Sequence, residues 1–267
     1  MIQLIAADLD GTLLDSKKQL SPDLFPLIRQ LRKNNIHFAA ASGRQYDNLR
    51  MLFSEVCDEI SFICENGAAV YQNSNCLFAD QMPAQYFIPP IHSIRTLPDV
   101  NAVLCTHAGA FIECSTDTVF VKNAQMYYEK LTIVPDLIAV LAQQPAFKLA
   151  VFEKAHAETG CFPILRSYAE HFAVVLSGAD WVDLMNPKTN KGVGLQQLAA
   201  HLHIPLCNTM AFGDYLNDTE LLQTAGCAFA MENGHSALKQ IADHIAPSNE
   251  ENGVVRAIQS YFHFTKS

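Results

Sequence analysis

Short apolar segments that end abruptly in polar residues limit the possible folds of this chain more than any other feature. Three of them lie near the start of the chain: residues 2–7 run into Asp8, 37–41 into Ser42, and 60–64 into Glu65. Continuous apolar runs of this length are typical of parallel strands that are buried on both faces. We therefore predict three parallel strands whose carboxyl ends carry polar residues.

Helix signals separate these predicted strands. Ser21 and Pro22 form an N-cap followed by a proline at the first helical position, which predicts a helix to about Asn34. Ser42 is a candidate N-cap for a second helix, from Arg44 to about residue 56. Alternating strands and helices of this kind predict a doubly wound, Rossmann-like α/β fold with a parallel sheet.

The C-terminal part repeats this alternation, and the middle of the chain does not. In the C-terminal part we expect strands at 209–212, 227–231 and 244–246, with helices from about 217, over 235–242 and from about 253. In the middle, strands are expected in closer succession at 100–106, 110–114, 147–153, 172–177 and 181–185, with helices near 135–144 and 158–171. The sequence thus predicts a discontinuous α/β core, residues 1–82 and 187–267, with an inserted α+β cap domain of residues 83–186.

The composition argues against several classes of protein. The formal net charge is −9 and Lys and Arg do not form a long run, so a nucleic-acid backbone is not an expected partner. The apolar runs are too short for a membrane span, and the apolar start of the chain breaks at Asp8, too early for a signal peptide. The eight cysteines are scattered without a CxxC pair, which indicates neither a disulfide framework nor a zinc site. We therefore expect a cytoplasmic protein.

Two acidic residues after the first predicted strand suggest metal-assisted chemistry. Asp8 and Asp10 lie two positions apart at a strand-to-loop junction, where both carboxylates can converge on one site. Protein sites hold Mg²⁺ with one or two carboxylates, water and substrate phosphate, and a carboxylate nucleophile needs such a cation near an anionic phosphoryl group. The alternatives are a calcium loop and a pair of residues that only cap the loop, and Gly11 falls at the wrong loop position for a calcium loop.

Further polar residues follow or precede other predicted elements. Asp214 lies at a strand end as a candidate metal ligand, while Asn217 and Asp218 either cap the next helix or contribute to the site. Lys191 opens a helix, where a cation is unfavourable without a compensating anion, so it is either a phosphate ligand or an exposed lysine. Ser42, with the amides that follow it, offers an anion site as well as a helix cap.

Four pieces of the sequence together resemble a known family. They are Asp8-Leu-Asp-Gly-Thr-Leu, Ala41-Ser-Gly-Arg, Asn190-Lys-Gly and Gly213-Asp-Tyr-Leu-Asn-Asp. In order and spacing they are similar to the motifs of the haloacid dehalogenase superfamily, in particular to its Cof-type phosphatases with a type IIB cap. Glu65-Asn-Gly-Ala and Ala230-Met-Glu-Asn-Gly extend the resemblance over nearly the whole chain.

The resemblance implies a reaction and a role for each of these residues. Asp8 is the expected nucleophile and Asp10 the general acid/base in a magnesium-dependent hydrolysis of small phosphate monoesters, such as sugar phosphates and related metabolites. The resemblance also implies that Asp8, the Asp10 carbonyl and Asp214 bind the metal. It implies that the phosphate is bound by Ser42, Lys191, Asn217 and the amides of Leu9 and Gly43. Asp218 and Arg44 are expected to support these ligands from behind.

The inserted domain is the expected source of substrate selectivity, because too few residues separate Asp10 from the first helix to form a cap there. Polar or aromatic candidates for this role, none of them fixed in direction by a motif, are His107, Lys122, Asp180, Trp181 and Asp183. Position 215 departs from the family pattern. It holds Tyr where the family often has a small residue, which predicts a bulkier wall of the site.

Two other functions are alternatives to hydrolysis. A phosphomutase uses the same paired aspartates but returns the phosphoryl group to the substrate. A sugar-phosphate-binding protein would bind such a ligand without turning it over. The presence of Asp8, Asp10, Lys191 and Asp214 argues against a pure binder, because binding does not require a nucleophile.

Overall fold

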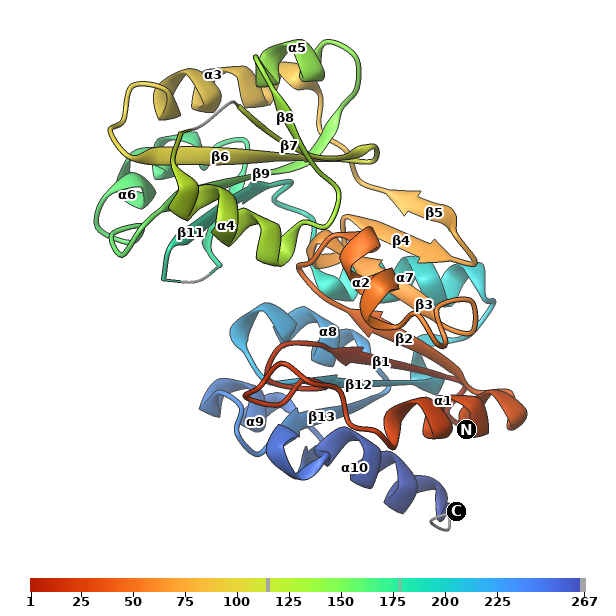
Figure 1. Ribbon diagram of the computed structural model, residues 1–267. Coiled ribbons are helices and arrows are strands. Elements are labelled where there is room, and N and C mark those ends of the chain that lie inside the picture. Colours follow the sequence, from red (N-terminus) through yellow and green to blue (C-terminus); the bar gives the residue numbers. More distant parts are fainter. Residues whose placement is uncertain (114–115, 178, 265–267) are drawn as a thin grey trace. The chain divides into compact units, whose positions relative to one another are not determined.

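The computed structural model describes residues 1–113, 116–177 and 179–264, which form two compact units (Figure 1). Met1–Phe78 and Asn190–Ser267 make up the first unit, and Ala79–Thr189 the second. The sequence placed the inserted domain at residues 83–186. The first unit contains every residue that the sequence singled out for catalysis, metal binding or phosphate binding.

The first unit is built on an eight-stranded sheet. Its strands, in order across the sheet, are β14 (His244–Ala246), β13 (Cys227–Met231), β12 (Thr209–Gly213), β1 (Leu4–Asp8), β2 (His37–Ala41), β3 (Ser61–Cys64), β4 (Ala69–Gln72) and β5 (Asn75–Ala79). The strands from β14 to β3 are parallel to their neighbours, and β4 runs antiparallel to β3. The predicted doubly wound parallel core is confirmed, whereas the sequence did not predict β4 and β5.

Helices cover both faces of this sheet. They are α1 (Leu24–Lys33), α2 (Tyr46–Leu52), α7 (Lys191–His201), α8 (Thr219–Thr224), α9 (Ser236–Ile241) and α10 (Gly253–Phe262), with short 3-10 helices η1 (Glu65–Gly67), η3 (Leu206–Asn208), η4 (Leu216–Asp218) and η5 (Asn249–Glu251). On one face, α7, α8 and α9 pack against small strand residues such as Ala6 and Ala39. On the other, Phe53 after α2 contacts Phe25 of α1 and Phe62 of β3, and α10 contacts β13 through another ring pair. Burial on both faces explains why the central strands are mostly apolar.

Two of the predicted N-caps are wrong. Asp23 rather than Ser21 is the N-cap of α1, because the Ser21 hydroxyl accepts a hydrogen bond from the N–H of Asp23 at 3.3 Å and closes a turn outside the helix. Gln45 rather than Ser42 is the N-cap of α2. The Ser42 hydroxyl instead accepts from the N–H of Arg44 at 3.1 Å, which shapes the loop after β2.

The second unit is the predicted α+β domain. Its six-stranded sheet has the order β10 (Ala173–Leu176), β11 (Trp181–Met185), β9 (Ala146–Glu153), β6 (Val100–Thr106), β7 (Gly109–Glu113) and β8 (Leu131–Val134). Neighbouring strands are antiparallel, except that β7 and β8 are parallel. Helices α3 (Ala84–Ile94), α5 (Leu137–Leu141) and α6 (Cys161–Leu165, followed by η2, Arg166–Tyr168) pack on one face, and α4 (Thr118–Tyr127) packs on the other.

The sequence did not predict α3, α4 or β8. Cys114, the last residue of one expected strand, lies outside the described residues. Within the described parts of both units, the helices are too short or too polar to cross a membrane.

Candidate active site

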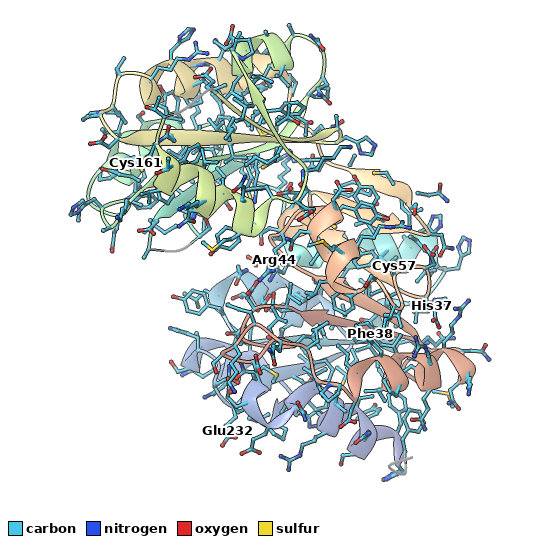
Figure 2. All side chains as sticks on the ribbon, viewed as in Figure 1. His37, Phe38, Arg44, Cys57, Cys161 and Glu232 are labelled. Carbon is cyan, nitrogen blue, oxygen red and sulfur yellow. The ribbon has the colours of Figure 1, made fainter. Side chains whose placement is uncertain are left out.

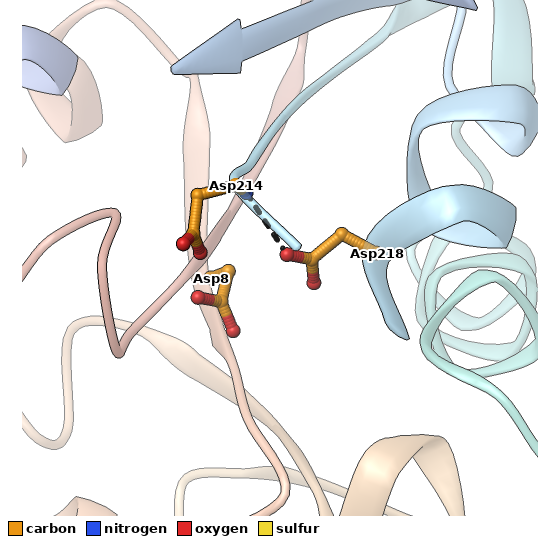
Figure 3. Close-up of side chains that lie close together, drawn as sticks. All are labelled: Asp8, Asp214 and Asp218. Carbon is orange, nitrogen blue, oxygen red and sulfur yellow. Dashed lines mark hydrogen bonds between the residues drawn. The ribbon is translucent and has the colours of Figure 1, made fainter. Parts of the chain in front are cut away.

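Three carboxylates converge at the carboxyl ends of β1 and β12. Asp8 is the last residue of β1, Asp214 follows β12, and Asp218 ends η4. One carboxylate oxygen from each residue lies within 4.8 Å of the other two, and Figure 3 shows the three side chains gathered around one point. β1 and β12 are parallel neighbours, which brings residues from the two ends of the chain to the same edge of the sheet.

A buried lysine joins two of these carboxylates. Nζ of Lys191, the first residue of α7, lies 2.5 Å from Oδ1 of Asp8 and 2.6 Å from Oδ1 of Asp218. The exposed fractions of Lys191, Asp8 and Asp218 are only 1%, 5% and 0%. Burial alone would lower the pKa of Lys191, but the charges of Asp218 and Asp8 raise it above its usual value. The lysine therefore stays charged, and the two carboxylates compensate for its place at a helix start.

The cluster holds more negative charge than this lysine can balance. Burial raises the pKa of Asp8 well above its usual value, and the charge of Asp218 raises it further, while Lys191 acts in the opposite direction. Burial and the charge of Asp218 also raise the pKa of Asp214 to about 6, against the effect of a hydrogen bond from the Thr12 hydroxyl at 3.1 Å. A divalent cation would relieve this repulsion, and carboxylate oxygens are the ligands that Mg²⁺ prefers, so the donor set fits that ion.

Asp218 is suited to hold the loop rather than to bind a metal. Its Oδ1 accepts from Lys191, and its Oδ2 accepts from the N–H groups of Asp214 at 3.0 Å and Tyr215 at 3.3 Å. Figure 3 marks the bond between Asp218 and the main chain of Asp214. Because both oxygens of Asp218 are engaged, Asp8 and Asp214 are the side chains that remain for a cation.

Two cations hold the carboxylate of Asp10. Nη2 and Nε of Arg44 donate to its two oxygens at 2.7 and 3.0 Å, and Nζ of Lys18 donates to Oδ1 at 2.9 Å. Burial alone would raise the pKa of Asp10, but the bonds and charges of Arg44 and Lys18 lower it overall. Arg44 follows the carboxyl end of β2, whereas His37 and Phe38 lie at the other end of that strand (Figure 2). In the chain without substrate, Arg44 and Lys18 thus favour the ionised form of Asp10.

The turn Glu65–Gly67 supports the loop that carries Arg44. Its three residues have φ values of 50°, 54° and 97°, a left-handed conformation that is costly for the first two. Its first two N–H groups donate to the carbonyl oxygens of Arg44 at 3.1 Å and Ser42 at 3.0 Å. A Cβ on Gly67 would lie 2.0 Å from the carbonyl oxygen of Asn190, the N-cap of α7, so only glycine fits. The turn therefore connects the loop after β2 to the start of α7.

The remaining predicted phosphate ligands also lie in the first unit. Leu9 and Ser42 are buried. Gly43 packs against Asn66 so closely that a Cβ would lie 3.0 Å from the amide oxygen. Asn217 lies in η4 and is exposed. The roles of these four residues stay predictions.

Sequence reasoning missed three residues of this site. Thr12 and Lys18 contact the carboxylates described above, and Nδ2 of Asn233 donates to the carbonyl oxygen of Gly11 at 2.8 Å. Thr12 and Asn233 lie inside sequence pieces that carried the family resemblance, which was the available signal. Lys18 lies in a loop that shows no motif.

Three of the candidates in the second unit contribute to its fold. Asp183 is buried, with a lysine nitrogen 3.5 Å from its carboxylate. The indole N–H of Trp181 donates a hydrogen bond of 3.0 Å within the second unit. The carboxylate of Asp180 accepts a separate hydrogen bond of 2.7 Å there. His107 and Lys122 are exposed.

Comparisons with known proteins cover both units. The model of the haloacid dehalogenase-like hydrolases matches residues 5–258. The 5-amino-6-(5-phospho-D-ribitylamino)uracil phosphatase YbjI of Escherichia coli (strain K12) is 31% identical over 96% of this chain and 95% of its own. YitU of Bacillus subtilis (strain 168), which has the same enzyme name, is 29% identical over 97% of each chain. The crystal structure of SMU.1108c from Streptococcus mutans UA159 is similar with a TM-score of 0.85, at 27% identity, over 98% of this chain and 100% of its own.

Proposed function

Because the chain belongs to the haloacid dehalogenase-like hydrolases, as one of their Cof-type phosphatases, we propose that it hydrolyses phosphate monoesters through a phosphoryl group carried on Asp8. The observation that carries this proposal is the position of Asp8, buried at a strand end between Lys191 and two further carboxylates. Burying several charged groups together costs free energy, and an aspartate with a purely structural role would not require it.

In the first step of the proposed reaction, a carboxylate oxygen of Asp8 attacks phosphorus and the bond from phosphorus to the ester oxygen breaks. Asp10, which must be protonated in the complex with the substrate, gives that proton to the leaving oxygen, which departs as an alcohol. In the second step, water attacks phosphorus, Asp10 accepts a proton from that water, and the bond between phosphorus and Asp8 breaks. The pairing with Arg44 holds Asp10 in the ionised form that the second step needs.

Residues around Asp8 would bind the phosphoryl oxygens. Lys191 offers positive charge beside the nucleophile, and Ser42, Asn217 and the amides of Leu9 and Gly43 are the further proposed donors. Donors fixed in this way stabilise the charge that develops on the phosphoryl group without rearranging during the reaction.

The carboxylates of Asp8 and Asp214, with the carbonyl oxygen of Asp10, would hold Mg²⁺. When bound, this ion supplies the positive charge that lets a carboxylate approach an anionic phosphoryl group. Gly11, with a φ of 85°, leaves room for the Asp214 carboxylate, because a Cβ there would lie 2.3 Å from Oδ2.

We further propose that the substrate is a small phosphorylated metabolite, and that the second unit, Ala79–Thr189, acts as the substrate-selecting cap. The first ester to assay is 5-amino-6-(5-phospho-D-ribitylamino)uracil, because two relatives that match nearly the whole chain are named for it.

A phosphate-release screen over phosphorylated metabolites, with and without Mg²⁺, tests the proposed function. We expect free phosphate from at least one ester, dependent on Mg²⁺ and abolished in Asp8→Asn, with the variant still folded by circular dichroism. Isomerised sugar phosphate without free phosphate would instead identify a phosphomutase. Phosphate release that persists in Asp8→Asn would refute nucleophilic attack by Asp8.

A further inference from the structure

Two large apolar side chains are exposed beside the proposed catalytic carboxylates of the first unit. Tyr215 directly follows Asp214 and is 57% exposed, and Leu216 follows it at 46%. The side chains of Asp8, Asp214 and Asp218 nearby are acidic and are buried or partly buried. Adjacent exposed apolar side chains that are bordered by polar residues are typical of ligand-binding surfaces.

The main chain holds Tyr215 in a fixed place. Its N–H donates to Oδ2 of Asp218 at 3.3 Å, and its carbonyl oxygen accepts from the N–H of Asp218 at 2.9 Å. On the other side, the N–H of His235 donates to the carbonyl oxygen of Asp214 at 2.7 Å. The ring is therefore presented from a segment that is bonded on both sides, which lowers the entropy lost when a ligand binds.

One neighbouring ring contacts Tyr215 and leaves most of it open. The imidazole of His235 lies with its centroid 5.9 Å from that of Tyr215, at an interplanar angle of 84°. His235 is itself held, because its Nδ1 accepts from the N–H of Ala237 at 3.2 Å. A perpendicular contact covers at most one face of a ring, so the tyrosine can still stack on a second flat group.

The location of Tyr215 in the fold determines which part of a substrate it could contact. In a doubly wound sheet, ligands bind beyond the carboxyl ends of the strands, over the loops that follow them. The phosphoryl group is expected at Asp8 and Asp214, and Tyr215 is the next residue along, with its Cα about 3.8 Å from that of Asp214. A leaving group that extends from the phosphate over this loop would meet the ring of Tyr215.

We propose that Tyr215 is a specificity-determining residue that stacks on a planar heteroaromatic ring in the leaving group. The preferred substrates would then be phosphate esters in which a short chain joins the phosphate to such a ring, with Leu216 adding apolar contact area. This inference rests on the proposed phosphatase reaction. It assigns part of the selectivity to the first unit in addition to the proposed cap.

A matched pair of esters separates this role from a structural one. 5-Amino-6-(5-phospho-D-ribitylamino)uracil contains the ring, and D-ribitol 5-phosphate has the same phosphorylated chain without it. Tyr215→Ala should raise the KM for the ring-bearing ester about tenfold, the effect of one lost stacking contact, and leave the KM for ribitol 5-phosphate unchanged. Tyr215→Phe should restore the wild-type difference. Tyr261→Ala, which removes another exposed tyrosine from α10, is the control and should change neither value.

An equal rise in KM for both esters in Tyr215→Ala, or no change for either, would overturn the proposal. The ring of Tyr215 would then contribute only to packing, or to neither packing nor binding. Binding to the Asp8→Asn variant keeps this test separate from the reaction. If that variant binds the ring-bearing ester more tightly than ribitol 5-phosphate, and Tyr215→Ala removes the difference, the role of Tyr215 stands even if the wild type hydrolyses neither ester. Without that difference in Kd the proposal is wrong, whatever the turnover.

Discussion

The ammonium group of Lys191 lies 2.5 Å from the carboxylate of Asp8, the proposed nucleophile, and 2.6 Å from that of Asp218. One buried cation is thus shared between a carboxylate proposed to react and a carboxylate that holds the loop after β12. Each group depends on the others for its charge state, so substitutions here affect both folding and turnover.

Lys191→Ala should lower both activity and stability. It leaves Asp8 and Asp218 buried without their cation, and breaking a buried ion pair costs about 3–5 kcal/mol of unfolding free energy. Urea denaturation measures this loss. The double variant Lys191→Ala/Asp218→Asn should recover part of the stability, because one uncompensated charge is gone, but no activity. A Lys191→Ala variant as stable as the wild type would contradict the buried ion-pair geometry.

Arg44→Ala should raise the pKa of Asp10, because burial, which raises that pKa, would then be opposed only by Lys18. Carbon-13 NMR of the Asp10 carboxyl group, followed as a function of pH, measures the change. Arg44→Lys should give a smaller shift, since lysine supplies the charge without the paired geometry. An Asp10 titration that does not move in Arg44→Ala would show that the ion pair is absent in solution.

Asp10→Asn should reduce turnover by about 10²–10⁴-fold, the usual contribution of a general acid/base. The loss should be smaller for esters whose leaving group is acidic, such as p-nitrophenyl phosphate, because these need less protonation. Comparison of kcat for such an ester and for an alkyl phosphate measures this. The same loss with both esters would argue against proton donation by Asp10.

The stability of the metal-free protein should depend on pH through Asp214. Its pKa is raised from 3.8 to about 6 in the folded chain, so its contribution to stability is fully present below 3.8 and is lost as the pH rises through about 6. Denaturation in chelator should therefore show wild type losing stability relative to Asp214→Asn between these values. Saturating Mg²⁺ should remove that loss, because the ion binds the ionised carboxylate. A difference between the two proteins that does not vary with pH would contradict this.

Gly11→Ala should weaken Mg²⁺ binding. The added Cβ would lie 2.3 Å from Oδ2 of Asp214, at a φ of 85° that alanine rarely adopts, so the carboxylate must move. Titration of activity with Mg²⁺ should show a higher half-saturating concentration. Gly109→Ala is the control, because it places alanine at a φ of 145° in the second unit and should leave the Mg²⁺ titration unchanged. Equal Mg²⁺ dependence in both variants would count against Asp214 as a ligand.

The sequence predicted the buried strands well and some helices poorly. β2, β6, β11 and β13 have the predicted bounds, because each is mostly apolar, although Asn101 interrupts β6 and Asp183 interrupts β11. α3 was missed because Pro89 and Pro90 lie inside it and normally signal a break. Its Phe87, Ile91 and Ile94 pack into the core of the second unit, and this burial outweighs the local preference.

Within the site, the local sequence pattern was sufficient to assign residues to one edge of the sheet, but not to predict which side chains contact one another. Asp8, Ser42 and Asp214 could be assigned to one sheet edge because parallel strands end there together. The contacts of Lys191 with Asp218, and of Lys18 with Asp10, join segments whose distance no local pattern encodes. These pairings follow only from the folded chain.

The stereochemical course at phosphorus tests the covalent mechanism most directly. An ester of thiophosphate made chiral with oxygen isotopes would be hydrolysed in isotopically labelled water, and the configuration of the released thiophosphate determined. Transfer to Asp8 and then to water comprises two in-line displacements, each of which inverts phosphorus, so we predict net retention. Net inversion would mean that water attacks the substrate directly, and would contradict a phosphoryl group on Asp8.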